Sequence, residues 1–180
     1  MKILIFGMSN VGKTTFGKLL AEKIQYDFVD LDEEIKNTNG TIKKFQERYP
    51  NQKKRDKVRA KMIDKILDAH ENIVVALSPI AYLDAYDSFF ENENILCFEL
   101  IDSAENIFER LEFTDDQDRL LHVPKSYLEK HKKEFMYEIK EDYKYFHGIY
   151  KKVMDSVSLK NKALEDVIQE VILRYHLNGN

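Results

Sequence analysis

Cysteine is nearly absent from this chain. Its 180 residues include one cysteine, Cys97, which lies in the apolar run 95–98 and has no partner for an internal disulfide. Such a chain suits a reducing compartment, so we predict a cytoplasmic protein. Cys97 itself is expected to be a small buried apolar residue.

Long apolar runs are absent as well. No segment approaches the roughly 18 apolar residues that a membrane helix needs. The apolar stretch Ile3–Phe6 is too short for a signal peptide. The net charge of -4 gives no general attraction to nucleic acid. The five histidines are scattered without metal-ligand spacing. We therefore predict neither a membrane nor a nucleic acid as a partner.

The size and composition are those of an ordinary globular protein. The chain is 43% apolar and 33% charged, which suffices for a sizeable core within one domain. No repeat, low-complexity segment or linker interrupts it. We predict a single domain over residues 1–180.

Short apolar segments alternate with longer segments of helical periodicity, a pattern typical of a parallel α/β sheet. The predicted strands are Lys2–Phe6, Asp27–Val29, Ile73–Leu77, Ile95–Leu100 and Ser156–Leu159. The predicted helices are Lys13–Ile24, Asp32–Lys36, Ile42–Tyr49, Lys54–Ala69, one beginning at Ser103, 124–152 and Asn161–His176. We predict an α/β fold of three layers, α/β/α, with a five-stranded parallel sheet.

Residues 7–14 read Gly-Met-Ser-Asn-Val-Gly-Lys-Thr, a G-x-x-x-x-G-K-[ST] phosphate-binding loop. The loop follows a predicted strand and precedes a predicted helix, as the motif requires. Its glycines allow a tight turn and close approach of the backbone to phosphate. The lysine can reach the β- and γ-phosphates, and the threonine hydroxyl can ligate magnesium. The predicted cofactors are ATP and Mg²⁺, with Gly7, Asn10, Val11, Gly12, Lys13, Thr14 and Thr15 as binding residues.

The loop alone does not distinguish a GTPase from a kinase. A GTPase also needs D-x-x-G and N-K-x-D, and Asn161-Lys162 is followed by Ala163-Leu164. The missing motifs favour a small-molecule kinase.

Two carboxylates, Asp30 and Asp32, directly follow the second predicted strand. One could help to hold magnesium, a role that we assign to Asp30, with Thr14 as the other candidate metal ligand. The other, Asp32, could accept the proton of an attacking hydroxyl. The alternative is that Asp32 only caps the next helix.

Two further segments interrupt the alternation of strands and helices. Residues 38–59 are rich in lysine and arginine, and residues 112–122 are acidic and polar. Each could be no more than a solvated helix face or surface loop. Ligands of open α/β sheets bind beyond the carboxyl ends of the strands, where both segments could form a cover.

Several motifs resemble the shikimate kinase family, within the P-loop kinases of nucleoside-monophosphate-kinase type. The loop continues through Thr15, Gly17 and Lys18 as in that family. Residues 28–35 match its F-x-D-x-D-x-x-I pattern, and residues 39–42 with Phe45 match the segment that follows. Residues 120–123 resemble the end of its lid motif, and Tyr150 and Asp155 fall where a Tyr and an Ala-Asp pair are expected.

The resemblance implies roles for these residues. Lys13 would hold the nucleotide, and Asp32 would contact shikimate hydroxyls and act as base. An acceptor-binding segment would span about residues 32–70, and a lid about 112–123. An arginine of the lid would cover the phosphates, with Arg119 as the catalytic candidate and Arg110 as a nucleotide-binding candidate. The loop from Ser158 to Asn161 would cradle adenine.

The sequence departs from the family on the acceptor side. The family's Gly-Gly-Gly run after the third strand is replaced by Ser78-Pro79-Ile80, in which Ile80 would add bulk beside a ligand. The arginine that grips the shikimate carboxylate corresponds to Lys54 or Arg55, without the preceding Phe. In the lid, Asp118 stands where arginine is usual. The predicted acceptor-binding residues are Asp32, Lys54, Arg55 and Ser78.

Three hypotheses remain open. The first is an ATP-dependent kinase that phosphorylates a hydroxyl of shikimate or a relative. The second is a nucleoside or nucleoside-monophosphate kinase, and the third is a nucleotide-binding protein that has lost catalysis. In the first two, the partner is a small anionic or polyhydroxylated acceptor, and the protein is a monomer or weak homodimer.

Overall fold

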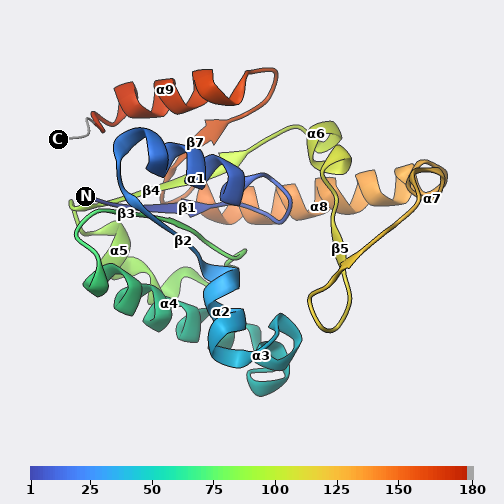
Figure 1. Cartoon of the computed structure of the whole chain (residues 1–180), viewed down its shortest axis with the longest axis horizontal. Coiled ribbons are helices and arrows are strands. Elements are labelled where there is room, and N and C mark those ends of the chain that lie inside the picture. The colour runs from blue at the N-terminus through green and yellow to red at the C-terminus, as the bar shows by residue number, and fades with distance from the viewer. Residues whose placement is uncertain (178–180) are drawn as a thin grey trace.

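A computed structural model describes residues 1–177, so the last three residues of the predicted domain 1–180 lie outside the described residues. Its main sheet has five parallel strands in the order β2-β3-β1-β4-β7 (Figure 1). The strands are β1 Lys2–Phe6, β2 Asp27–Asp30, β3 Ile73–Ala76, β4 Ile95–Ile101 and β7 Asp155–Ser158. The predicted five-stranded parallel sheet is confirmed, with strand ends within one residue of their predicted positions.

Helices cover both faces of the sheet. The elements are α1 Lys13–Ile24, α2 Leu31–Asn39, α3 Ile42–Arg48, α4 Gln52–Ala69, η1 Leu83–Ala85, α5 Asp87–Phe90, α6 Ala104–Glu109, α7 Lys125–Lys130, α8 Lys132–Tyr150 and α9 Leu164–Arg174. Figure 1 shows α1 and α9 on one face and α4 and α5 on the other. The predicted three-layer α/β/α arrangement is therefore confirmed.

The central strand β1 supplies both cores. Ile3 and Ile5 join the cluster beneath α1 and α9, whereas Leu4 and Phe6 join the cluster beneath α4 and α5. All four side chains are fully buried. A strand buried on both faces has a continuous apolar sequence, which is why 3–6 shows no alternation of polar residues.

The structure differs from the sequence prediction at several element boundaries, and three of these differences concern the lid region and the residues after β2. The predicted helix 124–152 is divided at His131 into α7 and α8. The lid segment contains a hairpin of β5 Phe113–Thr114 and β6 Leu120–Leu121. Helix α2 begins at Leu31, because the side chain of Asp30 caps it by accepting from the backbone N–H of Asp32 at 2.9 Å. Asp32 therefore lies inside the helix and does not cap it.

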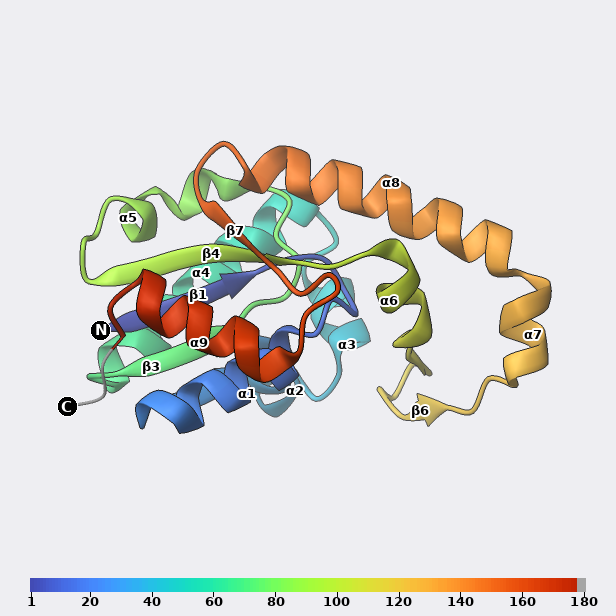
Figure 2. The same ribbon diagram turned by 90° about the horizontal axis from the view of Figure 1, so that it is seen from above.

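The segment after β4 extends beyond the sheet. Figure 2 shows α6, α7 and β6 gathered beyond one end of the sheet, away from both termini. Among the described residues, no helix is long and apolar enough to span a bilayer.

Candidate active site

The phosphate-binding loop joins β1 to α1 at the carboxyl edge of the sheet. Gly7, Asn10 and Gly12 have positive φ angles of 143°, 59° and 104°. A Cβ atom on Gly7 would stand 2.7 Å from the carbonyl oxygen of Leu100 in β4. Glycine is required there both by the backbone conformation and by close packing. This backbone forms the concave anion-binding turn that precedes a helix N-terminus.

Lys13 folds back over this loop. Its Nζ donates to the carbonyl oxygens of Gly7 at 2.9 Å and Met8 at 2.7 Å. Burial lowers the pKa of Lys13 from 10.5 to about 8, and the carboxylates of Asp32 and Asp30 act in the opposite direction. The lysine is thus held beside the turn by neutral acceptors that a phosphate could replace.

Thr14 and Asp30 form a pair next to the lysine. The Thr14 hydroxyl donates to Oδ2 of Asp30 at 2.5 Å, while Oδ1 of Asp30 caps α2. One hydroxyl and one carboxylate oxygen at the edge of a phosphate turn are hard oxygen ligands of the kind that Mg²⁺ prefers, with phosphate and water completing its shell. These two residues fit the cofactors that the loop predicts.

Asp32 lines a pocket of about 460 Å³. Its Oδ1 accepts a hydrogen bond of 2.5 Å from the hydroxyl of Ser78, which is buried at the end of β3. Ser9 of the phosphate loop lines the same pocket. The pocket therefore lies between the phosphate loop and the Asp32 carboxylate. Oδ2 of Asp32 makes no hydrogen bond within the described part of the chain.

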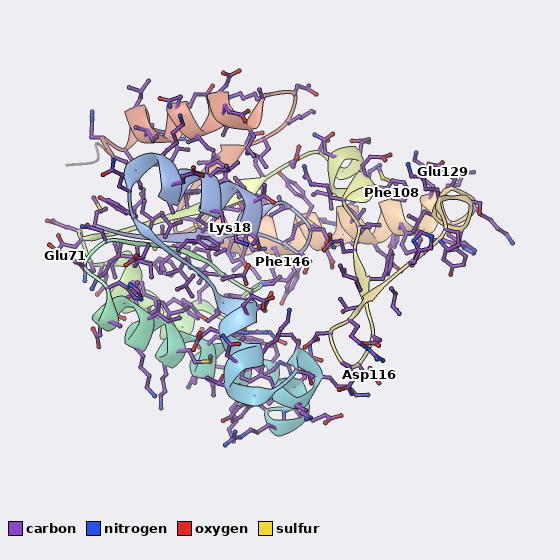
Figure 3. All side chains as sticks on the ribbon, in the orientation of Figure 1. Lys18, Glu71, Phe108, Asp116, Glu129 and Phe146 are labelled. Carbon is purple, nitrogen blue, oxygen red and sulfur yellow. The ribbon has the colours of Figure 1, made fainter. Side chains whose placement is uncertain are left out.

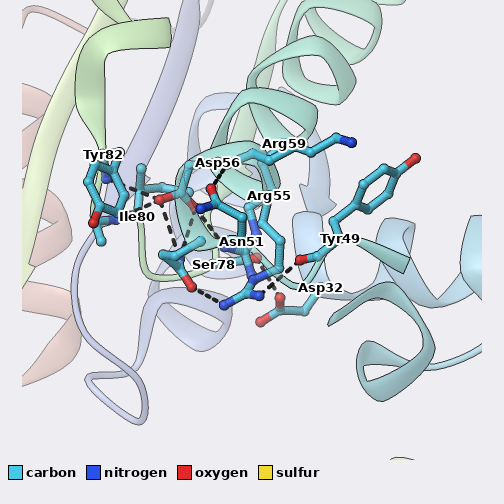
Figure 4. Close-up of polar contacts among 12 residues, drawn as sticks. Asp32, Tyr49, Asn51, Arg55, Asp56, Arg59, Ser78, Ile80 and Tyr82 are labelled. Atoms are coloured by element: carbon cyan, nitrogen blue, oxygen red, sulfur yellow. Dashed lines mark hydrogen bonds and ion pairs between the residues drawn. The ribbon is translucent and has the colours of Figure 1, made fainter. Parts of the chain in front are cut away.

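Helix α4 contributes several side chains to this pocket, and Figure 4 shows their polar contacts. Its side chains Gln52, Arg55 and Arg59 line the cavity together with Ile42, Gln46, Pro79, Tyr145 and Phe146. Arg55 donates through Nη1 to the carbonyl oxygens of Tyr49 and Pro50, both at 2.9 Å. Its position is therefore fixed by the turn between α3 and α4.

Two buried polar groups hold the wall formed by residues 78–82. The carboxylate of Asp56 accepts from the backbone N–H groups of Ala81 at 3.1 Å and Tyr82 at 3.0 Å. The hydroxyl of Tyr150 accepts from the N–H of Ile80 at 2.9 Å and donates to its carbonyl oxygen at 2.8 Å. The side chain of Ile80 is fully buried in the core. The expected bulk of Ile80 beside a ligand is therefore wrong, because the side chain points away from the pocket.

The lid hairpin rests on the acceptor-binding segment. Oδ2 of Asp118 accepts from the N–H of Ile42 at 2.8 Å, and Asp116 forms an ion pair with Lys43 at the start of α3. Figure 3 shows Asp116 at the tip of the hairpin near α3. The guanidinium of Arg119 pairs with Asp115 of the same hairpin at 2.7 Å, and its side chain is 77% exposed. The structure does not bring Arg119 to the phosphate loop.

Arg110 is the arginine that lies against the loop. It donates to the carbonyl oxygens of Asn10 and Val11, both at 3.3 Å, and pairs with Asp102 at 2.6 Å. Ser158 lies at the end of β7 and lines a second pocket of about 400 Å³ with Asp102 and Lys140. The next residue, Leu159, lies close to Gly12, because a Cβ atom on Gly12 would be 3.7 Å from Cδ1 of Leu159.

Of the four residues predicted to bind the acceptor, the structure brings three together in one pocket and leaves one outside it. Arg55 and Ser78 line the pocket with Asp32, whereas Lys54 is exposed and lies 5.9 Å from the ring of Tyr49. Sequence reasoning missed Asp56 and Gln52. Gln52 and Asp56 are four residues apart, as are Arg55 and Arg59. This helical spacing is the sequence signal that could have indicated that all four side chains lie on one face of α4.

The fold and the loop together define a P-loop kinase. A family model described as shikimate kinase matches residues 9–175, so the chain belongs to the shikimate kinase family. It is an ATP-dependent kinase that phosphorylates a hydroxyl group. The resemblance seen in the sequence motifs is thereby confirmed.

Individual relatives cover nearly the whole chain. The shikimate kinase of Persephonella marina is 28% identical over 172 residues, which are 96% of this chain and 97% of the relative. The solved shikimate kinase of Aquifex aeolicus is 26% identical with a TM-score of 0.68, covering 98% of this chain and 96% of that one. The solved shikimate kinase of Bacteroides thetaiotaomicron, at 20% identity and a TM-score of 0.74, covers 98% of both chains and shares the fold.

Proposed function

We propose that this kinase transfers the γ-phosphate of ATP to a hydroxyl of a small hydroxylated acid, with shikimate as the first candidate. The observation that carries the proposal is the pocket beside Asp32. It is lined by the Asp32 carboxylate, by Ser9 of the phosphate loop and by the Arg55 guanidinium. An acceptor that carries both a hydroxyl and an acid group suits this lining. The shikimate kinase names of the relatives support the choice of shikimate.

The roles proposed for the donor side follow from its geometry. Lys13 would leave the carbonyl oxygens of Gly7 and Met8 to bind the β- and γ-phosphates. Mg²⁺ would bind between the phosphates and the Thr14 hydroxyl, with Asp30 ligating it directly or through water. Both cations would offset the negative charge that the transferred phosphoryl group develops.

Asp32 is the proposed base. The acceptor oxygen attacks the γ-phosphorus, the bond from that phosphorus to the β-γ bridging oxygen breaks, and ADP leaves. The hydroxyl proton passes to the Asp32 oxygen that Ser78 does not occupy. Ser78 holds the carboxylate in place and so replaces part of the contact that backbone would otherwise make with the acceptor.

The proposal is tested by ADP release with ATP, Mg²⁺ and a panel of acceptors: shikimate, other hydroxy acids, sugars, nucleosides and nucleoside monophosphates. We expect turnover with shikimate or another hydroxy acid, and none with the Lys13→Ala control. Turnover with a nucleoside monophosphate alone would support the second hypothesis. Binding of ATP by calorimetry without turnover on any acceptor would support a protein that has lost catalysis.

The remaining proposals concern the context of the reaction. We propose that residues 1–180 form one domain, that the protein acts in the cytoplasm, and that it is a monomer or weak homodimer. The single cysteine, which has no partner for an internal disulfide, supports a reducing location. Burial raises the pKa of the Cys97 thiol to about 12 and keeps it unreactive. Sedimentation at several concentrations measures the oligomeric state.

A further inference from the structure

Helix α8 contributes two aromatic rings to the acceptor pocket. Tyr145 and Phe146 both line the cavity, and their rings meet at 83° with centroids 5.1 Å apart. Figure 3 shows Phe146 toward the middle of the molecule, away from Glu129 at the outer end of α7. The same pocket is lined by the Asp32 carboxylate and by the Ser78 hydroxyl. Its lining is therefore amphipathic, with charged and polar groups together with two flat apolar rings.

These two rings belong to a row of four that begins next to the phosphate loop. Phe6, the last residue of β1, contacts Tyr150 with ring centroids 5.5 Å apart. Tyr150 stacks on Phe146 at 6.0 Å with an interplanar angle of 25°. Phe6 and Tyr150 are fully buried. Tyr145 is thus the outermost ring of a row whose inner members are fixed in the core, and Phe146 supports it from the inside.

Tyr145 is the ring of this row that is left uncovered. The residue is 53% exposed, and its hydroxyl makes no hydrogen bond to any described residue. An exposed tyrosine is ordinary on a protein surface, but this one lines a cavity that also contains the proposed base. An aromatic side chain offers a large apolar area and has few rotatable bonds. A ligand that covers it gains binding free energy by removing that area from water.

The chemistry of this ring limits the shape of the acceptor. The face of an aromatic ring gives a hydroxyl group no ordinary hydrogen-bond partner. An acyclic polyhydroxy acid carries hydroxyl groups along its whole length, so packing it against the ring would bury unpaired hydroxyls at a cost. A carbocyclic acid such as shikimate has one side of its carbon ring free of hydroxyl groups. That side can cover the aromatic ring while the polar groups meet the polar lining.

We propose that Tyr145 is a specificity-determining residue that packs against the apolar side of the acceptor's carbon ring. The pocket thereby prefers a cyclic hydroxy acid to an acyclic one. This inference rests on the proposed function, since it names the class of acceptor that the same site takes.

The first experiment measures binding of shikimate by calorimetry to the wild type and to the Tyr145→Ala, Tyr145→Phe and Tyr137→Ala variants. Tyr137 is the matched control, because it is a 67% exposed tyrosine of the same helix that does not line the pocket. We expect Tyr145→Ala to weaken binding about tenfold, the effect of losing an aromatic contact. Tyr145→Phe keeps the ring and should stay within about twofold of the wild type, as should Tyr137→Ala.

Folding and nucleotide binding are measured on the same variants. Tyr145→Ala should keep the thermal unfolding midpoint and the ATP affinity of the wild type, because the ring is exposed and lies on the acceptor side. If alanine disturbs the fold, Tyr145→Gln replaces the ring by a flexible amide of intermediate size and gives the same test. Equal shikimate affinities of Tyr145→Ala and Tyr137→Ala would overturn the role of Tyr145. So would a loss in Tyr145→Phe as large as that in Tyr145→Ala, because the ring would then not be the group that matters.

The second experiment compares shikimate with gluconate, an acyclic polyhydroxy acid of the same charge. The wild type should bind shikimate more tightly, and gluconate binding below detection supports the same preference. Where gluconate binds, Tyr145→Ala should change its affinity less than about twofold and so narrow the preference several-fold. Tighter binding of gluconate by the wild type, or an unchanged preference in folded Tyr145→Ala, would overturn the selection of a cyclic acceptor.

The two experiments also separate this inference from the proposed function. A wild type that phosphorylates shikimate, with equal affinities in the two alanine variants, refutes only the role of Tyr145. A wild type that binds neither acid refutes the proposed function, and this inference with it.

Discussion

The donor side and the acceptor side proposed for this active site are built differently. The donor side is a backbone structure, in which positive φ angles at Gly7 and Gly12 shape a turn beside Lys13. The acceptor side is a side-chain structure, in which Asp32, Ser78, Arg55 and Arg59 surround a pocket whose wall is fixed by Asp56 and Tyr150. A backbone turn binds any nucleotide phosphate, whereas side chains decide which acceptor is bound. Changes on the two sides should therefore affect different steps.

The largest effect is expected from the donor side. Lys13→Ala should lower kcat a thousandfold or more, because a preorganised cation that offsets transition-state charge is lost. The fold should survive, since the partners of Lys13 are loop carbonyl groups. Acceptor-dependent ADP release and the circular dichroism spectrum measure the two outcomes. Activity close to that of the wild type would refute the role of the loop.

Asp32→Asn should reduce kcat about a hundredfold or more while leaving ATP affinity nearly unchanged, because the proposed base is lost but the loop is intact. Asn keeps an oxygen that can accept from Ser78. Steady-state kinetics with both substrates distinguish the two sides. A matching loss of ATP affinity would instead assign Asp32 to the metal or to the structure.

Tyr150→Phe is expected to destabilise the acceptor wall. The change leaves the N–H and the carbonyl group of Ile80 without their partner in a fully buried position. Each unsatisfied group costs about 1–3 kcal/mol, so the free energy of unfolding should fall by about 2 kcal/mol or more. Urea unfolding measures the loss, and KM for the acceptor should rise more than KM for ATP. An unchanged midpoint would contradict this assignment.

The donor side should also respond to pH. Lys13 must be charged to bind phosphate, and its pKa is lowered to about 8 by burial. kcat/KM for ATP should therefore fall about tenfold per pH unit above this value. Between pH 8 and 10.5 the unfolded chain holds a proton that the folded chain has lost, so this group makes stability rise with pH in that window. A pH profile that stays flat to pH 10 would contradict the shift.

The smallest effect is expected at the contact between lid and acceptor segment. Asp116→Asn removes an exposed ion pair with Lys43, and such pairs contribute little. Acceptor KM should change less than about fivefold, and the unfolding midpoint should not change measurably. Hydrogen exchange of residues 112–123 should nevertheless increase, with Glu129→Gln as a control for an exposed charge elsewhere. Unchanged exchange would show that this pair does not hold the hairpin.

The sequence predicted the donor side better than the acceptor side for physical reasons. Strand, glycine turn and helix are local features, so Gly7–Thr14 could be read directly from spacing. The pocket depends on contacts between distant residues, such as Asp56 with Ala81 and Tyr150 with Ile80. Helical spacing indicates that Arg55 and Arg59 share a face, but not that this face meets the segment after β3. The position of Arg119 depends on its pairing with Asp115 in a hairpin that no periodicity predicted.

The segment 79–82 leaves no backbone donor to a substrate. Pro79 has no N–H, the N–H of Ile80 is used by Tyr150, and those of Ala81 and Tyr82 are used by Asp56. A relative with glycines at these positions would recognise its acceptor through backbone groups, which an amino-acid substitution does not replace. In this protein side chains recognise the acceptor. Single substitutions could therefore change the acceptor preference without changing the backbone conformation.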